Sequence, residues 1–417
     1  MHDKEFQLGE LISILSGFPF DSELFTDDPG QPLIRIRDLL SAEIKTYYSG
    51  PFDKRYVVDN GEILIGMDGD FNVIRWTKGP ALLNQRVCLV KSASQELDES
   101  FLFWLLGPKV ESIHKTTPQT TVKHLSVNDL KGLTVRIPER VHQQKIAQIL
   151  DTLDTQIQKT DALIAKLEKI KEGLLHDLLT RGIDHNGQLR PMQEQAPELY
   201  KESALGLIPR EWDVSELGTV TTSSVIGPFG SDLVASDYRS EGVPVVFVRD
   251  IAGARYNRVS RVFVSHKKAL ALSAHEVKAG DLLLTKMGLP PCISAVYPEN
   301  EPAGIITADI VRLRLNAAVT PKWAQYFVNS EYVKAQVRGI TAGVTRPKVT
   351  LKDVRSLKIA IPSTEEQARI LDILQHCSKR LGSERAELSK LQSQKPGLMD
   401  DLLTGRVRVT PLLKDAG

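Results

Sequence analysis

The sequence is poor in cysteine, with three in 417 residues. Cys88, Cys292 and Cys377 stand alone, without a Cys-x-x-Cys pair or a neighbouring histidine cluster, so we expect neither a structural disulfide nor a zinc site. Isolated thiols are typical of a reducing compartment, and we expect a cytoplasmic protein. No apolar run approaches the length that spans a bilayer, and the start MHDKEFQLGE lacks the character of a signal peptide.

Motifs of nucleotide-dependent enzymes are also missing. There is no GxxxxGK[ST] phosphate loop, and no glycine-rich strand–helix turn is followed by a suitable acidic residue. The Asn/Asp-Pro-Pro-aromatic tetrapeptide, with which amino-methyltransferases hold a flipped base, is absent, because Pro290-Pro291 lies between Leu289 and Cys292. The nine histidines are scattered. These absences favour a binding protein, and we expect no catalytic residue, metal or cofactor in this chain.

Strong charge of one sign is lacking too, since the formal net charge is +1. Residues 1–138 contain 15 Lys and Arg against 19 Asp and Glu, a net of −4. Residues 212–361 contain 19 against 13, a net of +6. The second segment could therefore present a basic surface to nucleic acid, whereas the first would have to concentrate its cations on one face. Net charge by itself argues only weakly for DNA binding.

What the chain does contain is a long heptad pattern from Glu139 to Thr180. Mostly apolar residues recur there at alternating spacings of four and three, which predicts a helix that packs along a second helix. Pro138 suits the start of this helix and Gly182 its end. At 1.5 Å per residue, the helix would be roughly 60 Å long. A helix of that length with one apolar stripe needs a partner.

The partner is predicted in the same chain, 224 residues further on. Residues 363–404 repeat residues 139–180 without insertion, including the Gln, Gly, Asp and Thr positions as well as the apolar ones, which indicates an internal duplication. Gly382 and Pro396 lie inside the second copy, so we expect a kink or break near Pro396. The expected coiled-coil interface consists of Ile146, Leu150, Leu153, Ile157, Ile164, Leu167, Ile370, Leu374, Leu381, Leu388 and Leu391.

The globular segment before each long helix repeats as well. PLIRIRDL at residues 32–39 returns as PVVFVRDI at 244–251, and GEILIGMDG at 61–69 returns as GDLLLTKMG at 280–288. The offset grows along the chain, so the insertions fall in loops. Each half ends in a predicted helix, a Thr-rich loop and a strand. Because strands and helices do not alternate regularly, we predict an α+β fold with a mixed, mostly β core.

These patterns divide the chain into two globular domains, two long helices and two connecting segments. The segment between the first helix and the second domain is polar, contains three prolines and has no sustained period, so we expect a linker packed loosely on the surface. The tail is expected to be partly frayed. The predicted boundaries are domain 1 at 1–138, helix 1 at 139–182, linker at 183–211, domain 2 at 212–362, helix 2 at 363–404 and tail at 405–417.

This arrangement, with helices that repeat better than the domains, resembles the specificity subunit of type I restriction–modification systems. The resemblance covers essentially the whole chain, although the usual IPxxW lead-in precedes only the second domain. It rests on GLIPREW at 206–212, RIRDL and FVRDI, the series from Gly61 to Val87, and the paired helix ends KEGLLHDLLT and KPGLMDDLLT.

The resemblance implies two target-recognition domains, related by a pseudo-twofold internal repeat, that read a bipartite double-stranded DNA site with one half-site each. It implies that the helices form an antiparallel coiled coil on which two methyltransferase subunits dock, with restriction subunits joining through them and no membrane involved. Adenine methylation with S-adenosylmethionine, and DNA cleavage with ATP and Mg²⁺, would belong to those partners. A coiled-coil adaptor whose domains bind protein remains an alternative interpretation.

Loop-borne cations and amides are the candidate DNA contacts, because such groups grip phosphates and read base edges. Any one of these cations could equally be a solvated surface charge. Asn84 and Gln85 are compatible with reading or with a scaffold role, and Phe20 and Phe229 are expected in the core. The candidates are Asn72, Arg75, Lys78, Arg86, Lys115, Thr117, Gln119 and Thr120 in the first half, and Arg255, Arg258, Lys286, Thr345, Arg346 and Lys348 in the second.

Overall fold

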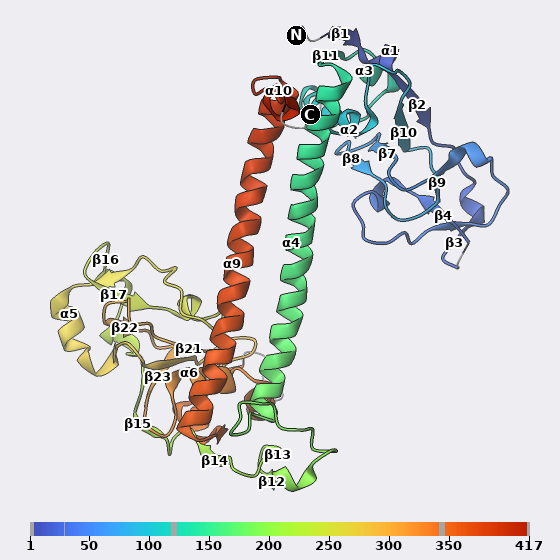
Figure 1. The fold of residues 1–417 in the computed structure, drawn as a ribbon. Coiled ribbons are helices and arrows are strands. Elements are labelled where there is room, and N and C mark those ends of the chain that lie inside the picture. Colours follow the sequence, from blue (N-terminus) through green and yellow to red (C-terminus); the bar gives the residue numbers. More distant parts are fainter. Residues whose placement is uncertain (1–3, 29, 118–122, 342–346, 415–417) are drawn as a thin grey trace. The chain divides into compact units, whose positions relative to one another are not determined.

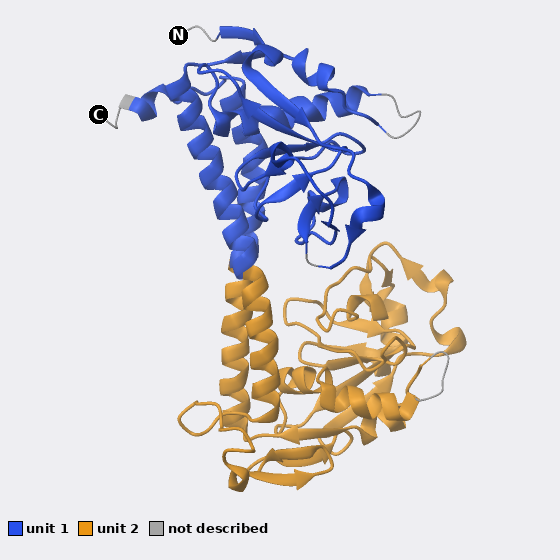
Figure 2. Cartoon of the chain, turned by 90° about the vertical axis from the view of Figure 1, so that its right-hand side faces the viewer, with its two compact units in different colours: residues 1–163, 384–417 blue, residues 164–383 orange. Residues whose placement is uncertain are grey.

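The chain forms two compact units, which are coloured separately in Figure 2. Unit 1 consists of residues 1–163 and 384–417, and unit 2 consists of residues 164–383. Each unit contains one globular domain and part of each long helix. Among the described residues, no helix combines the length and apolar character needed to cross a membrane. Figure 1 shows the computed structural model, which describes residues 4–28, 30–117, 123–341 and 347–414.

The globular domain of unit 1 is built on two sheets. An antiparallel sheet has the order β2 (Ile12–Ser16), β10 (Val87–Ser92), β7 (Ile63–Gly66), β8 (Val73–Arg75). A mixed sheet has the order β3 (Phe25–Thr26), β5 (Tyr47–Tyr48), β4 (Gln31–Ile34), β9 (Ala81–Leu83), β6 (Val57–Val58). Within the mixed sheet, β4 and β9 run parallel. A further pair joins β1 (Lys4–Gln7) to β11 (Thr134–Ile137).

The core of this domain lies on both faces of β7. Leu64 packs with Ile34 of the mixed sheet, and Ile63 and Ile65 on the opposite face pack with helix α2 (Glu99–Thr116). Successive strand residues point to opposite faces, so the unbroken apolar run of β7 is what a strand covered on both sides requires. The short helices α1 (Leu8–Leu11) and α3 (Val127–Lys131) close the same cluster.

The globular domain of unit 2 repeats this topology strand for strand. Its antiparallel sheet has the order β15 (Thr221–Ile226), β23 (Ile310–Leu315), β20 (Leu282–Thr285), β21 (Ser294–Val296). Its mixed sheet has the order β16 (Tyr238–Arg239), β18 (Phe263–Val264), β17 (Val243–Val246), β22 (Gly304–Ile306), β19 (Glu276–Val277). The pair β14 (Asp213–Glu216) and β24 (Lys358–Ile361) corresponds to β1 and β11. The α+β class and the internal repeat are therefore confirmed.

The helices of unit 2 differ slightly from those of unit 1. Two helices, α6 (Pro321–Val328) and α7 (Glu331–Thr341), stand where unit 1 has α2 alone. Helix α8 (Leu351–Ser356) corresponds to α3, and both begin with a capping box, Ser126 with Asp129 and Thr350 with Asp353. An additional helix, α5 (His266–Ala271), follows β18.

The long helices are α4 (Arg140–Thr180) and α9 (Thr364–Leu403). Within unit 1, the start of α4 packs with the end of α9, as Ile146 and Leu402 share one core cluster. Within unit 2, the end of α4 packs with the start of α9 through Leu178 and Ile370. The two helices are therefore antiparallel neighbours in each unit (Figure 1).

The residues at the predicted heptad positions of α4 and α9 are all at least half-buried. Leu388, Ile157 and Leu167 are half-buried, whereas the other predicted interface residues are buried: Ile146, Leu150, Leu153, Ile164, Ile370, Leu374, Leu381 and Leu391.

Helix α9 passes through Pro396 without interruption, so the expected break is wrong. A proline inside a helix removes one backbone hydrogen bond, but packing on both sides can hold the helix together. Lys395 forms an ion pair with Asp154 of α4 and lies 5.1 Å from the centroid of the Trp104 ring. Leu398, two residues beyond the proline, packs against the core of unit 1. Tertiary contacts flank the proline and fix the helix there.

Helix α4 ends as the sequence predicts. Gly182 has a φ of +63°, and its amide bonds to the carbonyl of Asp177 at 3.3 Å. A Cβ at this position would lie 2.3 Å from Glu366 Oε1 and 2.5 Å from the Trp212 ring. Glycine is required here by both the left-handed conformation and the close approach of α9.

A buried glutamine joins each domain to its long helix. Gln143 of α4 accepts from the Asp98 N–H at 2.8 Å and donates to the carbonyls of Glu96 and Pro138. Gln367 of α9 makes the corresponding bonds to Thr320, Ala318 and Pro362. Both side chains are fully buried, and both amides bridge the start of the domain helix to the strand end. The repeat therefore extends to individual hydrogen bonds.

The segment 183–211 is folded rather than loosely packed. It contains a hairpin of β12 (Tyr200–Ser203) and β13 (Gly206–Pro209), and Arg190 is only 6% exposed. The Arg190 guanidinium donates to Glu366 of α9 at 2.6 Å and to Glu211 at 2.7 Å. Burial alone would lower the pKa of Arg190, but hydrogen bonds and charge from both carboxylates raise it. Sequence reasoning missed this network, because its partners lie far apart in the chain.

The tail was expected to be partly frayed, and the part of it that the structure describes is packed. Val409 is 3% exposed and belongs to the core of unit 1, and a short helix, α10 (Thr410–Lys414), follows it. The buried side chain of Val409 therefore attaches the tail to the core of unit 1.

Candidate nucleic-acid interface

In unit 2, the turn after β20 and the end of the Thr-rich loop lie side by side. Met287 and Lys348 form an isolated β-bridge, and the Val349 N–H donates to the Lys286 carbonyl at 2.9 Å. The Lys286 ammonium lies 4.7 Å from the centroid of the Phe229 ring. We call Phe229, Lys286, Met287 and Lys348 the β20 surface. The bridge thus brings the backbones of two segments about 60 residues apart, each carrying a predicted cation, side by side.

Phe229 is 54% exposed, so its expected place in the core is wrong. Its counterpart Phe20 is 7% exposed and is packed with Leu33 and Tyr48, as expected. An exposed aromatic ring beside a lysine offers both a stacking surface and a cation, which is the combination found where proteins hold nucleic acid. Local sequence could not separate the two phenylalanines, since both follow a proline.

The equivalent surface of unit 1 has different charges. Asp68 and His124 form the corresponding β-bridge, and the Leu125 N–H donates to the Met67 carbonyl at 2.8 Å. The Asp68 carboxylate lies 2.7 Å from both Arg86 Nη1 and His124 Nδ1. Arg86 is 57% exposed despite this ion pair. The backbone frame is shared, but the side chains presented on it are not.

Arg75 and Lys78, two predicted first-half contacts, are bound within unit 1, Arg75 to the long helix α4 and Lys78 to the domain itself. The Arg75 guanidinium pairs with Asp151 of α4 at 2.6 Å and lies 4.4 Å from the centroid of the Phe103 ring. The Lys78 ammonium donates to the Asp38 carbonyl at 2.5 Å. Burial lowers the pKa of Lys78, an effect that the Asp38 charge opposes. Both cations hold elements of the domain together.

The remaining candidates occupy varied positions. Lys115 is 72% exposed beside Glu111 at 2.7 Å, and Arg255 is exposed. Arg258 pairs with Glu301 at 3.3 Å. Thr117 Oγ1 donates to the Ile113 carbonyl at 2.8 Å. The backbone carbonyl of Asn72 accepts from the Gly66 N–H, and the side chain is half-buried. The candidates outside the described residues are Gln119, Thr120, Thr345 and Arg346.

The sequence left open whether Asn84 and Gln85 read bases or belong to the scaffold. The two residues differ in exposure. Asn84 is 8% exposed and its Oδ1 accepts from the Gln85 N–H at 2.8 Å, which is a scaffold contact. Gln85 is exposed at the same turn.

In the repeated Arg-Asp pair, the aspartate is buried and has a structural role, whereas the arginine lies at the surface. Asp250 is 1% exposed and accepts from the N–H groups of Phe247, Val259 and Ser260. Arg249 is held over the Phe247 ring at 4.5 Å and donates to Ser260 Oγ at 2.6 Å. It lines a cavity of about 480 Å³ in unit 2, for which unit 1 has a counterpart of about 350 Å³. From the sequence, this motif was interpreted only as the end of a strand, so Arg249 was not among the predicted DNA contacts.

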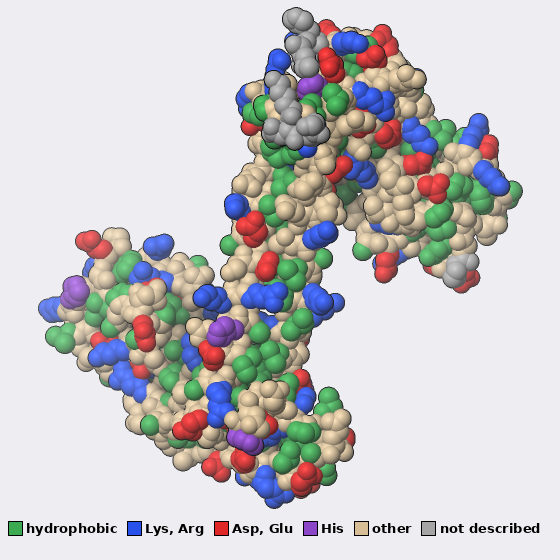
Figure 3. Space-filling model, viewed as in Figure 1, with side chains coloured by type: hydrophobic (Ala, Val, Ile, Leu, Met, Phe, Trp, Pro, Cys, Tyr) green, Lys and Arg blue, Asp and Glu red, His purple; other side chains and the backbone are tan. Residues whose placement is uncertain are grey.

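The cations do not form one continuous basic face in the view of Figure 3, where Lys and Arg side chains are interspersed with Asp and Glu. Candidate contacts are therefore local groups on loops. No group of three or more His, Cys, Asp or Glu side chains among the described residues could hold a metal ion.

Two copies of one α+β domain, each joined to a pair of antiparallel helices, define a two-part recognition protein. Residues 2–169 and 209–393 match the family described as the type I restriction modification DNA specificity domain. The chain belongs to this family, so the resemblance noted from the sequence is confirmed.

Relatives and solved structures agree with this assignment. The chain is 28% identical over 383 residues to the type I restriction enzyme EcoBI specificity subunit of Escherichia coli, covering 89% of this chain and 78% of that protein. It is 22% identical over 366 residues to the MjaVIII specificity subunit of Methanocaldococcus jannaschii, covering 86% and 82%. Its fold is similar to the crystal structure of a type I restriction–modification S subunit from M. genitalium, with a TM-score of 0.59, 16% identity and 96% coverage of each chain.

Proposed function

We propose that this chain reads a bipartite DNA sequence, with one half-site for each globular domain, and holds the methyltransferase subunits of a type I complex. One observation carries the proposal: the two domains share the same strand order but present different side chains at equivalent loop positions. A common frame docks on DNA in the same way twice, and divergent loops select different bases. A protein that bound one partner symmetrically would have no need of this divergence.

The β20 surface contacts the second half-site in this proposal. Lys348 is exposed and Lys286 lies over Phe229, so the two ammonium groups can grip phosphates beside a ring that can stack. Arg346 lies outside the described residues and is proposed as a contact of the same half-site. In the first domain Arg86, Gln85 and the exposed Lys115 take this role.

The chemistry belongs to partner subunits in this proposal. S-adenosylmethionine is used by two adenine methyltransferase subunits that dock on α4 and α9, and ATP and Mg²⁺ are used by restriction subunits that join through them. The paired long helices support this assignment, because a helix pair with exposed outer faces can accept further helices. The cytoplasm is the proposed compartment.

A methylome tests the bipartite reading. The chain is expressed with its neighbouring methyltransferase subunit in a host free of DNA methylation, and modified adenines are mapped. We expect a single asymmetric motif in two parts with a fixed gap, methylated on both strands. A stable complex that leaves the genome unmodified would instead favour the adaptor interpretation.

The domain assignment is tested with Lys348→Ala, with Lys267→Ala as the matched control. Lys267 is also an exposed lysine of unit 2, but it lies on α5, a helix that packs against the mixed sheet. Losing one phosphate contact lowers the salt dependence of DNA affinity by about 0.9 in the log–log slope. We expect this loss for Lys348→Ala only. An equal loss of slope in both variants would show that it comes from the lower overall charge of the chain and not from a phosphate contact of Lys348.

A further inference from the structure

The repeated Arg-Asp pair places an exposed arginine at the same point of both domains. Arg37 follows β4 in unit 1 and Arg249 follows β17 in unit 2, each within a single 3₁₀ turn that ends on the aspartate. Both arginines are exposed, whereas Asp38 and Asp250 are 3% and 1% exposed. Each aspartate accepts from the backbone N–H three residues before it, at 2.9 Å in unit 1 and 2.8 Å in unit 2. The aspartate therefore holds the turn, and the arginine projects from it.

A buried hydroxyl holds each guanidinium in place. Arg37 Nη2 donates to Thr46 Oγ1 at 3.1 Å, and Arg249 Nε donates to Ser260 Oγ at 2.6 Å. The two hydroxyl residues, Thr46 and Ser260, are 5% and 3% exposed. The guanidinium of Arg249 also lies 4.5 Å from the centroid of the Phe247 ring. A cation that is already fixed loses little side-chain entropy when it binds a ligand.

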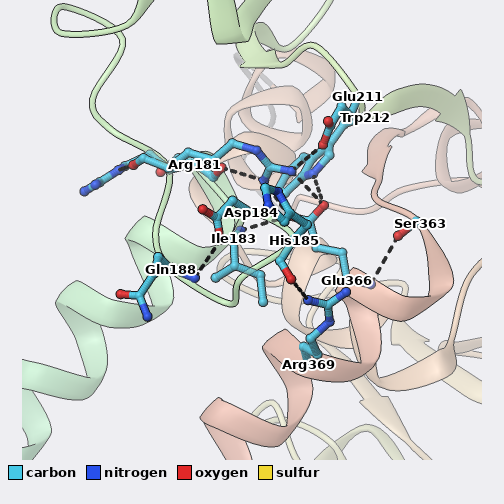
Figure 4. Close-up of polar contacts among 12 residues, drawn as sticks. Arg181, Ile183, Asp184, His185, Gln188, Glu211, Trp212, Ser363, Glu366 and Arg369 are labelled. Atoms are coloured by element: carbon cyan, nitrogen blue, oxygen red, sulfur yellow. Dashed lines mark hydrogen bonds and ion pairs between the residues drawn. The ribbon is translucent and has the colours of Figure 1, made fainter.

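No close carboxylate neutralises either guanidinium. Among the described residues, Arg249 forms no ion pair and its two Nη atoms have no hydrogen-bond partner. The Arg37 side chain is 60% exposed, and its one carboxylate neighbour there is Asp38, at 4.0 Å from Nε. Arg190 shows the opposite case, since it is buried and donates to two carboxylates (Figure 4). An arginine that is fixed, exposed and weakly paired is suited to bind an anion from solution.

In unit 2, the turn adjoins the β20 surface. The cavity of about 480 Å³ is lined by Arg249, by the residues on either side of Phe229 and by Asp309. The carbonyl of Asp309 accepts from the Lys286 N–H at 2.8 Å, and the Lys286 ammonium lies over the Phe229 ring. Arg249 is thus connected to the candidate DNA contacts through the wall of one cavity.

The equivalent cavity of unit 1 has the same frame with a different lining. It is lined by Ile36, the neighbour of Arg37, and by Arg86. The Arg86 carbonyl accepts from the Met67 N–H at 2.9 Å, so Arg86 occupies the place that Asp309 has in unit 2. This lining residue changes from a cation to an anion, while the arginine of the turn is the same in both domains. A constant residue beside varied ones indicates a contact that does not depend on sequence.

We propose that Arg37 and Arg249 are equivalent phosphate anchors, each of which binds a backbone phosphate of its own half-site. This contact sets the register in which the neighbouring loops meet the bases. The proposal rests on the proposed function and deepens it, because it names positioning residues that are distinct from the readers. The fork of N–H groups on a guanidinium matches two phosphate oxygens. Phosphates carry no base identity, so one arginine can serve two domains that read different sequences.

Glutamine replacement tests the proposal, since Arg37→Gln and Arg249→Gln remove the charge and keep a polar side chain. The DNA affinity of the complex with the methyltransferase subunits is measured over a range of salt concentrations. One duplex carries the motif found by the methylome, and another has a random sequence. We expect each variant to lower the log–log salt slope by about 0.9 on both duplexes, and the double variant by about 1.8. The methylated motif itself is expected to stay the same.

Matched controls separate a phosphate contact from charge in general. Arg55→Gln is the control in unit 1, because the Arg55 side chain is 63% exposed but pairs with Asp53 at 3.1 Å. Arg210→Gln is the control in unit 2, where the exposed Arg210 donates to a backbone carbonyl. Both controls are expected to keep the salt slope of the wild type. Arg37→Lys and Arg249→Lys retain the charge and are expected to restore most of it.

Three outcomes overturn the proposal. A slope that stays unchanged in both glutamine variants would leave the two arginines with a structural role only. A methylated motif that changes at a base in Arg249→Gln would make Arg249 a reader of sequence. An equal loss of slope in the controls would assign the effect to overall charge. In each of these cases the wild-type complex still binds its motif and the proposed function stands, whereas a wild-type complex that binds neither duplex refutes the proposed function itself.

Discussion

Replacing Glu366 by alanine would leave the Arg190 guanidinium buried without its main partner. The two side chains are 8% and 7% exposed and form an ion pair at 2.6 Å, and the same carboxylate accepts from Trp212 and Ile183. Breaking a buried ion pair by removing one partner costs about 3–5 kcal/mol, and here the buried guanidinium would keep only the exposed Glu211 as a charged partner. For a unit of this size, the melting temperature of unit 2 should fall by roughly 10 °C.

Glu211 provides the matched control. Its carboxylate also bonds to Arg190, at 2.7 Å, but its side chain is 78% exposed. Exposed ion pairs contribute about 0–1 kcal/mol, because water replaces most of the interaction. Glu211→Ala should therefore have little effect on unit 2. Similar distances and different burial make these two variants a direct comparison of the two environments.

Hydrogen exchange followed by mass spectrometry is the suitable assay, because a single optical signal would mix two units that contain two tryptophans each. In Glu366→Ala, peptides from residues 183–212 and from the start of α9 should lose protection at lower urea. Peptides from β10 in unit 1 should not change. Equal stability of Glu366→Ala and Glu211→Ala would refute the argument that burial gives Glu366 its importance.

Two further predictions concern groups that the fold encloses. Burial raises the pKa of Cys88 and of Cys292 to about 12, so both stay protonated at pH 8, whereas Cys377 is half-buried. A maleimide should label one thiol per native chain and three in denaturant, and a second native label would contradict this. Gln143→Leu removes the side-chain partner of three partly buried backbone groups, so at about 0.5–1 kcal/mol for each lost hydrogen bond unit 1 should be destabilised by about 2 kcal/mol, measured by exchange in α2. Loss of protection in unit 2 instead would count against the assignment of this contact.

The long helices and the duplication could be predicted because their signals are local and repeated. Heptad spacing requires only a few residues of sequence, and the offset of 224 compares two stretches without any knowledge of contacts. Pro396 shows the limit of this reasoning. Its helix-breaking tendency is real, but Lys395 and Leu398 on either side are fixed by packing that the sequence does not display.

The candidate interface was only partly predictable. Lys286 and Lys348 were chosen separately from two loops, and their backbones lie side by side because Met287 and Lys348, about 60 residues apart, form a β-bridge. Arg75 and Lys78 belonged to the same class of loop-borne cation, yet both are bound within unit 1. Local sequence gives the type of a side chain but not its partner, because the partner lies on a distant segment.

The sequence by itself determined the class of this protein: two α+β domains, two long helices and one duplication, all encoded in periodicity and in repeated order. Tertiary structure alone decided which side chains are free to act. It buried Arg190 against Glu366, and it exposed Phe229 while burying Phe20. The physical reason is that burial and pairing depend on contacts between segments far apart in the chain, whereas periodicity depends on neighbours.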